Sequence, residues 1–354
     1  MQPKIIFLDT YYGDMLASIQ DRQPTYKERN KALMDLSFGT ADFYSEAFKN
    51  YGWNSKDIVA NDFVGRQLWN KENFVGGLDN RASVFNEIMK DRPDCVYFQD
   101  LSFFDAEYLV KMKSAGILLA GQCSCPWPGD SAVRNYDFLY SSFPHYGDRF
   151  RKLNIEHNFL QIGFGGQKVL DKLPKPGARP IDISFVGGIG SHWQNGNFIL
   201  ETVARKINEF MWWGYGRELL PDCLLKRIWQ GPAFGLDMYK VYLRSKMVLN
   251  RHGEVAEGYM NNMRCFEATG CGAMLISEKS HNADYYFEPD KEYVTYSDEE
   301  ELIEKIRYYQ THDAEREKIA RAGFRRTMEN HTYGRILERP SKDLAFIIGK
   351  ELML

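Results

Sequence analysis

The feature that most constrains the fold is an alternation of short apolar runs with longer amphipathic segments. In chain order the runs read KIIFLD, CVYFQD, GILLAGQ, DFLYSS, IDISFVGG, MWWGYG, KMVLN and GAMLIS. Runs of this length, flanked by Gly and Asp, are typical of strands that are buried on both faces of a parallel sheet. The sequence therefore predicts the α/β class, with helices between parallel strands.

Length and a proline-rich break indicate two domains. The chain has 354 residues, which exceeds the roughly 250–300 residues at which single cores stop growing. Residues 171–180, DKLPKPGARP, contain three prolines and a glycine that exclude both a helix and a central strand. We expect a Rossmann-like domain over 1–172, a second over 178–335, and a C-terminal helix over 336–354 that packs back on the first domain. Ligands of such domains lie at the carboxyl ends of the strands.

Charge and cysteine spacing exclude several classes of protein. A net charge of -3 and a pI near 6.2 give no concentrated basic face for nucleic acid. Basic stretches such as RFRKLNIEH allow at most peripheral contact with an anionic membrane. No run approaches the roughly 18 apolar residues of a membrane span. The six cysteines show no C-x-x-C spacing and no secretory signal precedes them, so we expect reduced thiols in a cytoplasmic protein.

The segment 260–277, MNNMRCFEATGCGAMLIS, predicts a short helix that leads directly into a strand. Asn262 is a good N-cap and Gly270 suits the left-handed C-terminal position, so the helix is expected between them. Arg264 and Glu267 are three residues apart and share a face. The amino end of a helix attracts a diphosphate, an arginine adds donors, and an acid one turn on can accept hydrogen bonds from ribose hydroxyls. The alternative is a surface Arg–Glu ion pair.

These motifs resemble the GT-B glycosyltransferases, and within them the CgeB-like branch with its "glycosyl transferases group 1" C-terminal region. In the second half the matching stretches are KMVLNRHGE, RCFEATGCGAMLIS and an HTYxxR signature at His331, Thr332, Tyr333 and Arg335. In the first half they are FGTADFYSEAFKNYGW, PDCVYFQDLSFFD and YDFLYSSFPHYGDRFRKLNIE. The resemblance implies two Rossmann-like domains facing across a cleft. It also implies transfer of a sugar from a nucleoside-diphosphate sugar to a glycan, lipid-linked or protein acceptor.

The resemblance assigns ribose binding to Glu267, as the second acid of an E-x7-E pattern whose first position is Tyr259 here. Glycines after a strand let main-chain amides approach a phosphate, and a Trp can stack on the base. A tight turn, a buried Trp and a capping His are the alternatives. Besides Asn262, Arg264 and Glu267, the residues expected to bind the nucleotide sugar are Gly187, Gly188, Trp229, Gln230, Gly231 and His252.

Polar and aromatic residues follow the first strands of the N-terminal half. Gln99 and Asp100 end the run CVYFQD, at the expected carboxyl edge of the sheet. Asp100 is the first candidate for a general base that deprotonates the acceptor hydroxyl, and Asp14 is the second. Capping of a following helix is the alternative for Asp100. Together with Gln99, the residues expected to line the acceptor side are Tyr11, Tyr12 and Gly13, since aromatic faces suit sugar rings.

The sequence thus predicts a metal-independent glycosyltransferase without a cofactor, in which the nucleoside-diphosphate sugar is the donor substrate. No D-x-D occurs, so the charge of the diphosphate would be met by the helix end and Arg264. Two alternatives stay open. One is a nucleotide-sugar epimerase on the same fold, and the other is a non-catalytic nucleotide-sugar-binding protein. An NAD-dependent oxidoreductase is disfavoured because the third glycine of its fingerprint is missing.

Overall fold

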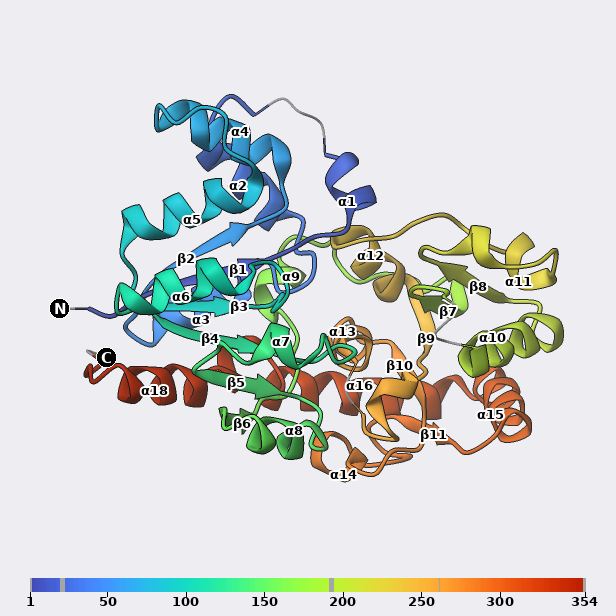
Figure 1. The fold of residues 1–354 in the computed structure, drawn as a ribbon. Coiled ribbons are helices and arrows are strands. Elements are labelled where there is room, and N and C mark those ends of the chain that lie inside the picture. The colour runs from blue at the N-terminus through green and yellow to red at the C-terminus, as the bar shows by residue number, and fades with distance from the viewer. Residues whose placement is uncertain (1, 20–22, 191–193, 261, 353–354) are drawn as a thin grey trace. The chain divides into compact units, whose positions relative to one another are not determined.

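The computed structural model describes residues 2–19, 23–190, 194–260 and 262–352. Contacts between residues divide the chain into two units (Figure 1). Unit 1 comprises Met1–Gln161 and Tyr333–Leu354, and unit 2 comprises Ile162–Thr332. The proline-rich segment 171–180 therefore belongs to unit 2.

Unit 1 is built on a six-stranded parallel sheet with the order β2-β1-β3-β4-β5-β6. Its strands are β1 (Lys4–Asp9), β2 (Asn54–Val59), β3 (Cys95–Phe98), β4 (Leu118–Gln122), β5 (Phe138–Ser141) and β6 (Glu156–Phe159). Its helices before the crossing to unit 2 are α1 (Gly13–Ala17), α2 (Tyr26–Asp35), α3 (Phe43–Asn50), α4 (Phe63–Glu72), α5 (Asn80–Asp91), α6 (Ala106–Ser114), α7 (Asp130–Val133) and α8 (Tyr146–Lys152).

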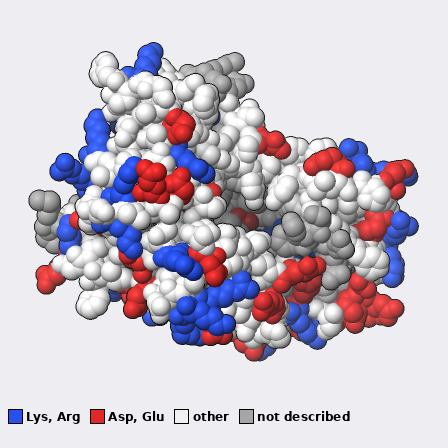
Figure 2. Space-filling view, in the orientation of Figure 1, with Lys and Arg blue, Asp and Glu red and all other residues white. Residues whose placement is uncertain are grey.

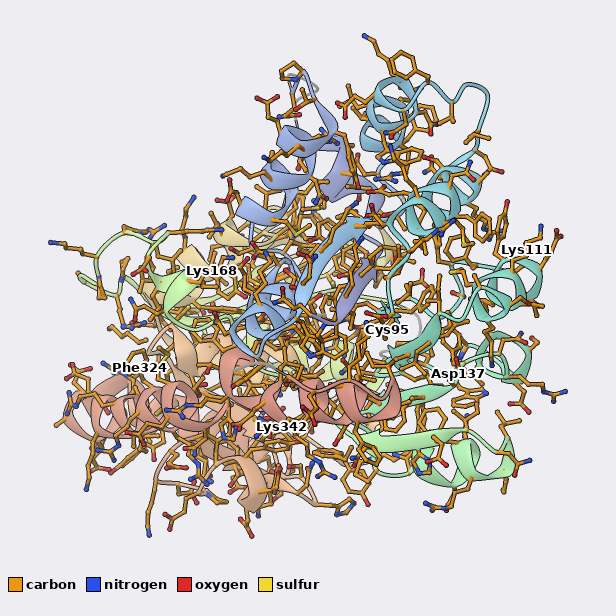
Figure 3. All side chains as sticks on the ribbon, turned by 90° about the vertical axis from the view of Figure 1, so that its left-hand side faces the viewer. Cys95, Lys111, Asp137, Lys168, Phe324 and Lys342 are labelled. Carbon is orange, nitrogen blue, oxygen red and sulfur yellow. The ribbon has the colours of Figure 1, made fainter. Side chains whose placement is uncertain are left out.

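The central strands of this sheet are buried because their side chains are apolar on both faces. Phe7 of β1 contacts the rings of Tyr44, Phe48 and Tyr97 at centroid distances of 5.6, 5.0 and 5.4 Å. Cys95 lies in the interior on β3, whereas Lys111 projects from α6 at the outer surface (Figure 3).

The C-terminal segment belongs to unit 1. It contains α17 (Tyr333–Ile336) and α18 (Glu338–Ile347), whose Lys342 is labelled in Figure 3. The ring of Tyr333 stacks on Phe43 of α3 at 5.6 Å. The indole Nε1 of Trp53, which is 1% exposed, donates to the Ser341 carbonyl at 3.2 Å. Leu344 and Ala345 of α18 are buried in unit 1, whereas Phe346 is 86% exposed.

Unit 2 carries a five-stranded parallel sheet with the order β11-β10-β9-β7-β8. Its strands are β7 (Ile181–Val186), β8 (Phe210–Trp213), β9 (Ser245–Leu249), β10 (Met274–Glu278) and β11 (Val294–Tyr296). Its helices are α9 (Gln167–Leu170), α10 (Gln194–Lys206), α11 (Leu224–Arg227), α12 (Leu236–Arg244), α13 (Met263–Gly270), α14 (Ala283–Tyr286), α15 (Glu299–Thr311) and α16 (Asp313–Asn330), with short 3-10 turns at Arg217–Leu219 and Glu254–Ala256. Side chains of β7 to β11 and of α10, α15 and α16 form its core.

Surface charge is mixed. Figure 2 shows acidic and basic side chains side by side on one face, with basic residues gathered at the lower edge over α8. Arg149, Arg151 and Lys152 of this helix are exposed. None of the described helices is long and apolar enough to cross a membrane.

Candidate functional site

The first turn of α13 lies at the carboxyl edge of the sheet of unit 2. Asn262 is the N-cap, and its Oδ1 accepts a hydrogen bond from the Arg264 amide at 3.0 Å. Its Nδ2 donates to the Arg251 carbonyl, which follows β9, at 2.9 Å. The predicted start of the helix is confirmed. The cap satisfies the Arg264 amide, so a ligand here would depend on the remaining donors and the helix dipole.

The helix ends at Gly270 as predicted, but the left-handed conformation expected for this residue is wrong. Gly270 is the last helical residue and is not left-handed; the left-handed glycine is Gly272, with φ +73°. A Cβ on Gly270 would lie 2.5 Å from the ring of Phe164. Glycine is therefore required at Gly270 by close packing, and at Gly272 by the turn into β10.

Arg264 connects the carboxyl ends of two neighbouring strands. Its Nε donates to the Val186 carbonyl at the end of β7 at 2.7 Å, and its Nη1 donates to Asn250 Oδ1, just after β9, at 2.8 Å. Its guanidinium carbon lies 4.4 Å from the centre of the Phe185 ring. The guanidinium is thus held in a fixed orientation, partly exposed, at the edge where nucleotides bind in doubly wound sheets.

The two glycines after β7 make room for side chains. A Cβ on Gly187 would lie 2.2 Å from Nη2 of Arg264, and a Cβ on Gly188 would lie 2.5 Å from the ring of Tyr215. The Gly187 amide donates to the Trp213 carbonyl at 2.9 Å. The Gly187 amide is therefore already hydrogen-bonded. Glycine is needed at this position because a side chain would occupy the space of the Arg264 guanidinium, whereas the sequence suggested a main-chain contact to phosphate.

Glu267 lies one turn further along α13 and is nearly enclosed. Its side chain is 5% exposed, and its Oε1 accepts a hydrogen bond from the Tyr239 hydroxyl of α12 at 3.4 Å. Burial raises the pKa of Glu267 to about 7, against the opposing effects of the Arg264 charge and the Tyr239 hydrogen bond. This burial excludes the exposed Arg–Glu pair as an explanation. An acid kept at such a cost is typical of a functional site.

His252 and Arg251 follow β9 next to Arg264. The main-chain amide of His252 donates to Glu278 Oε2 at 2.8 Å, and its Nε2 lies 3.2 Å from Ser277 Oγ. Burial lowers the pKa of His252 to about 4, so the imidazole is neutral at pH 7. Burial and the nearby charge of Arg264 lower the pKa of Arg251 to about 10. Arg251 and Glu278 were not singled out from the sequence; their only signal is a position at a strand end.

Trp229, Gln230 and Gly231, the residues expected to hold the base, follow β8 and form hydrogen bonds within unit 2. The indole Nε1 of Trp229 donates to the Gly214 carbonyl at 3.0 Å, and its ring lies 6.3 Å from Trp212 and 5.4 Å from the Arg217 guanidinium. The main-chain amide of Gln230 donates to the Trp212 carbonyl at 2.9 Å, and Gly231 adopts φ +113°. Trp229 is half-buried.

In unit 1, two carboxylates lie at the carboxyl edge of neighbouring strands. Asp100 Oδ2 accepts from Thr10 Oγ1 at 3.0 Å, and its Oδ1 accepts from the amide and hydroxyl of Ser102 at 2.9 and 2.7 Å. Asp9, the last residue of β1, was missed. Its carboxylate accepts from the Thr10 amide at 2.8 Å and from Thr40 Oγ1 at 3.1 Å. Burial raises the pKa of Asp9 to about 6. The signal for Asp9 was its place at the end of KIIFLD.

The other residues expected on the acceptor side differ in exposure. Tyr11 needs a correction: its side chain is 3% exposed and packs edge-on against Phe38 at 5.1 Å, so it belongs to the core. Tyr12 is 52% exposed, and Gly13 and Asp14 are exposed at the start of α1. The main-chain amide of Gln99 donates to the Leu8 carbonyl at 2.8 Å.

The first two residues of the HTYxxR signature, His331 and Thr332, contact other segments of unit 2. His331 is 4% exposed, and its Nε2 lies 2.8 Å from the Tyr286 carbonyl. The Phe164 amide donates to the His331 carbonyl at 2.8 Å, and Thr332 lies against Gly166. Among the described residues, no three His, Cys, Asp or Glu side chains are grouped so that they could hold a metal ion.

Comparisons with known proteins agree with this architecture. The profile of the family described as "Glycosyl transferase-like" matches residues 194–339. A glycosyltransferase from Rickettsia africae is similar in structure, with a TM-score of 0.59 and 10% identity, covering 99% of this chain and 100% of that one. Anabaena HepE, solved in complex with UDP-glucose, gives a TM-score of 0.60 and 13% identity, covering 98% and 99%. The chain has the GT-B fold.

The same fold is shared with a second class of enzyme. A candidate UDP-N-acetylglucosamine 2-epimerase from Listeria monocytogenes gives a TM-score of 0.55 and 11% identity, covering 100% of this chain and 98% of that one. A search of curated protein sequences finds no match. At these identities the structural likeness establishes the fold, and function has to be argued from the site.

Proposed function

We propose that the protein is a glycosyltransferase of the CgeB-like branch. It transfers a sugar from a nucleoside-diphosphate sugar to a hydroxyl of a glycan, lipid-linked or protein acceptor. The observation that carries the proposal is the convergence of the capped end of α13, the fixed guanidinium of Arg264 and the buried acid Glu267 at the carboxyl edge of one sheet. The family match over residues 194–339 and the likeness to a protein solved with UDP-glucose support it.

In this proposal the diphosphate binds at the first turn of α13, where the helix dipole and Arg264 meet its negative charge. The nucleotide reaches the nearly enclosed Glu267 with its ribose hydroxyls, which donate to the carboxylate. The imidazole of His252, which is neutral at pH 7, contacts the diphosphate in this proposal. We propose that the charge of the leaving group is met by these groups without a metal ion, and that Trp229, Gln230 and Gly231 contact the base.

The acceptor hydroxyl loses its proton to a carboxylate of unit 1. Asp100 and Asp14 are the candidates from the sequence, and Asp9 joins them because burial keeps its pKa near the working range of a general base. Substitution of the base by Asn should lower kcat far more than the affinity for UDP. Asp100→Asn, Asp14→Asn and Asp9→Asn, compared in the same assay, identify it.

Nucleotide binding is tested by thermal shift with UDP, GDP, TDP and CMP and their sugars. A ligand that binds only the folded state at 100 times its Kd stabilises it by about 2.7 kcal/mol, which raises Tm. Gly187→Ala should weaken binding at least about tenfold, because the new Cβ would lie 2.2 Å from Arg264 Nη2. Gly177→Ala is the matched control, since no atom lies within 4 Å of that Cβ. Absence of any shift across the panel would refute the proposed site.

The alternatives give different products. A glycosyltransferase consumes donor when acceptor is present, with slow hydrolysis in its absence. An epimerase on this fold would convert the donor without an acceptor and release an epimer. A binding protein would raise its Tm with donor but show neither reaction. The products of a donor incubated with and without acceptor, separated by chromatography, distinguish the three.

A further inference from the structure

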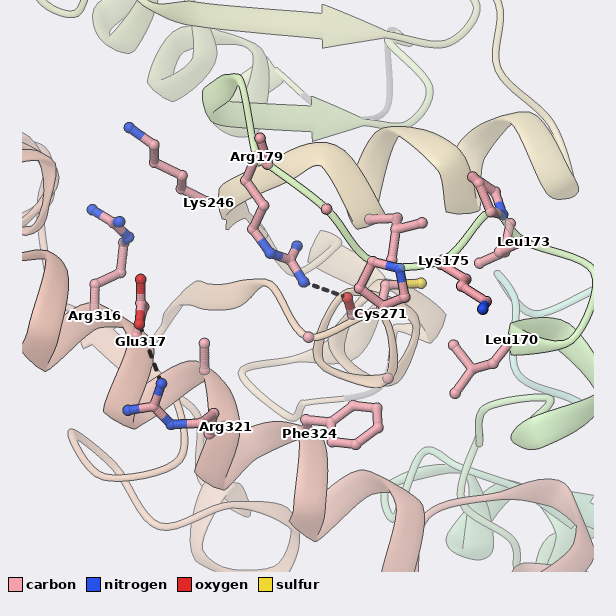
Figure 4. A pocket seen from close by; sticks show the side chains of 18 of the residues that line it. Leu170, Leu173, Lys175, Arg179, Lys246, Cys271, Arg316, Glu317, Arg321 and Phe324 are labelled. Atoms are coloured by element: carbon pink, nitrogen blue, oxygen red, sulfur yellow. Dashed lines mark hydrogen bonds and ion pairs between the residues drawn. The ribbon is translucent and has the colours of Figure 1, made fainter.

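Unit 2 contains a cavity of about 1000 Å³ (Figure 4). The cavity lies at the amino ends of the strands, whereas the candidate nucleotide site lies at their carboxyl ends. Its walls include Arg179 just before β7, Lys246 at the start of β9 and Gly272 just before β10. The candidate nucleotide residues follow these same strands. Helix α13 connects the two places, because Gly270 at its end lines the cavity and Arg264 lies in its first turn. Cavities of this size accept small organic ligands.

The lining of the cavity is basic. Its basic residues are Lys175, Arg179, Lys246, Arg316 and Arg321, against three acidic residues. Apolar side chains complete it, among them Leu170 and Phe324 (Figure 4). The lining therefore combines a positive charge with apolar surface.

Arg179 lies at the centre of this lining (Figure 4). Its Nη1 donates to the carbonyls of Tyr242 and Ser245 at 3.1 and 2.8 Å, and its Nη2 donates to that of Cys271 at 2.8 Å. These bonds use three of the five N–H groups of a guanidinium. Within the described ranges no carboxylate lies within 4 Å of Arg179, and Gly272 leaves the space that its guanidinium fills. The side chain is thus fixed by main-chain carbonyls, with two donors left over.

Two other basic residues of the lining, Arg321 and Lys175, are exposed and, among the described residues, are not fixed by strong ion pairs. Arg321 pairs with Glu317 at 3.2 Å, but the two side chains are 70% and 60% exposed, and such pairs contribute little. Lys175 is exposed on the proline-rich segment. Arg321 can exchange its carboxylate partner for a ligand at small cost.

We propose that this cavity binds a small organic anion, with a ring or other apolar body and a phosphate, sulfonate or carboxylate group. The anionic group lies against Arg179, between Lys175 and Arg321, and the apolar body lies against Leu170 and Phe324. This site is separate from the nucleotide site and does not depend on the proposed reaction.

The probe is anilinonaphthalene sulfonate, an aromatic anion whose fluorescence rises on binding, titrated into the full-length protein. The cavity variant is Lys175→Glu with Arg321→Glu. The control is Arg205→Glu with Arg227→Glu, exposed residues of the same unit that also form ion pairs, with Glu201 and Asp222. We expect the probe to bind the cavity variant at least about tenfold more weakly than the parent, and the control within about twofold of the parent.

Three results would overturn the inference. The parent could fail to bind the probe, the two double variants could bind it equally, or excess UDP could displace it completely. The last result would put the probe in the nucleotide site. Because Arg179 holds two helix ends, it is left unchanged, and the melting temperature of each variant without probe shows that the fold is kept.

Discussion

Substitution of Glu267 by Gln should stabilise the protein at neutral pH while weakening nucleotide binding. Burial raises the pKa of Glu267 from 4.5 to about 7, so the folded state prefers the protonated acid. The stability that this preference contributes is complete below pH 4.5 and is lost as pH rises through 7. Each pKa unit corresponds to about 1.4 kcal/mol, so the ionised carboxylate costs roughly 3 kcal/mol above pH 7 relative to acid solution.

Glu267→Gln removes this titration but keeps the shape of the side chain. The difference in unfolding free energy, variant minus parent, should therefore rise by about 3 kcal/mol between pH 4.5 and pH 8. Urea denaturation at several pH values measures it. Using the difference cancels the titration of other acids such as Asp9, and the fixed cost of an unpaired amide does not vary with pH.

Glu218→Gln is the matched control, because Glu218 is an exposed acid of the same unit. Its difference from the parent should stay within about 0.5 kcal/mol at every pH. A flat difference for Glu267→Gln would show that this carboxyl is not penalised by burial. Unchanged UDP affinity of the same variant would remove its role at the ribose, even if the stability result holds.

Three further changes test other contacts. Arg264→Lys cannot keep both the Val186 and the Asn250 hydrogen bonds, so urea denaturation should show a loss of about 1–3 kcal/mol and UDP should bind more weakly; an unchanged midpoint would contradict this. Burial lowers the pKa of His331 from 6.5 to about 4, so the unfolding free energy of the parent minus that of His331→Gln should fall by roughly 3 kcal/mol as pH falls through that range; a difference that does not change with pH would contradict a neutral buried imidazole. Trp53→Phe removes the hydrogen bond from the indole to the Ser341 carbonyl and should lower the Tm by an amount equivalent to about 0.5–1.5 kcal/mol, whereas a Tm equal to that of the parent would show that α18 does not depend on this bond.

The strands that the sequence did not reveal are polar or very short strands at sheet edges. All eight apolar runs contain strands, but β2, β6 and β11 were not recognised. Each of the three is an edge strand. An edge strand has one neighbour and can carry polar residues, as NSKDIV of β2 and EHNF of β6 do, so these two lack the continuous apolar run of a central strand. Strand β11 has only three residues, whereas the edge strand β8 reads FMWW and was recognised.

The sequence by itself determined the α/β class, the central strands and the N-cap at Asn262, because these depend on local patterns: apolar periodicity and the hydrogen bond of a side chain to an amide two residues away. Only the tertiary structure decided what the candidate residues touch. Arg264 extends to two strand ends that are distant in sequence, Glu267 is enclosed under Tyr239, and Tyr11 is in the core. Burial and long-range contacts arise when separate segments pack together, and no spacing within one segment records them.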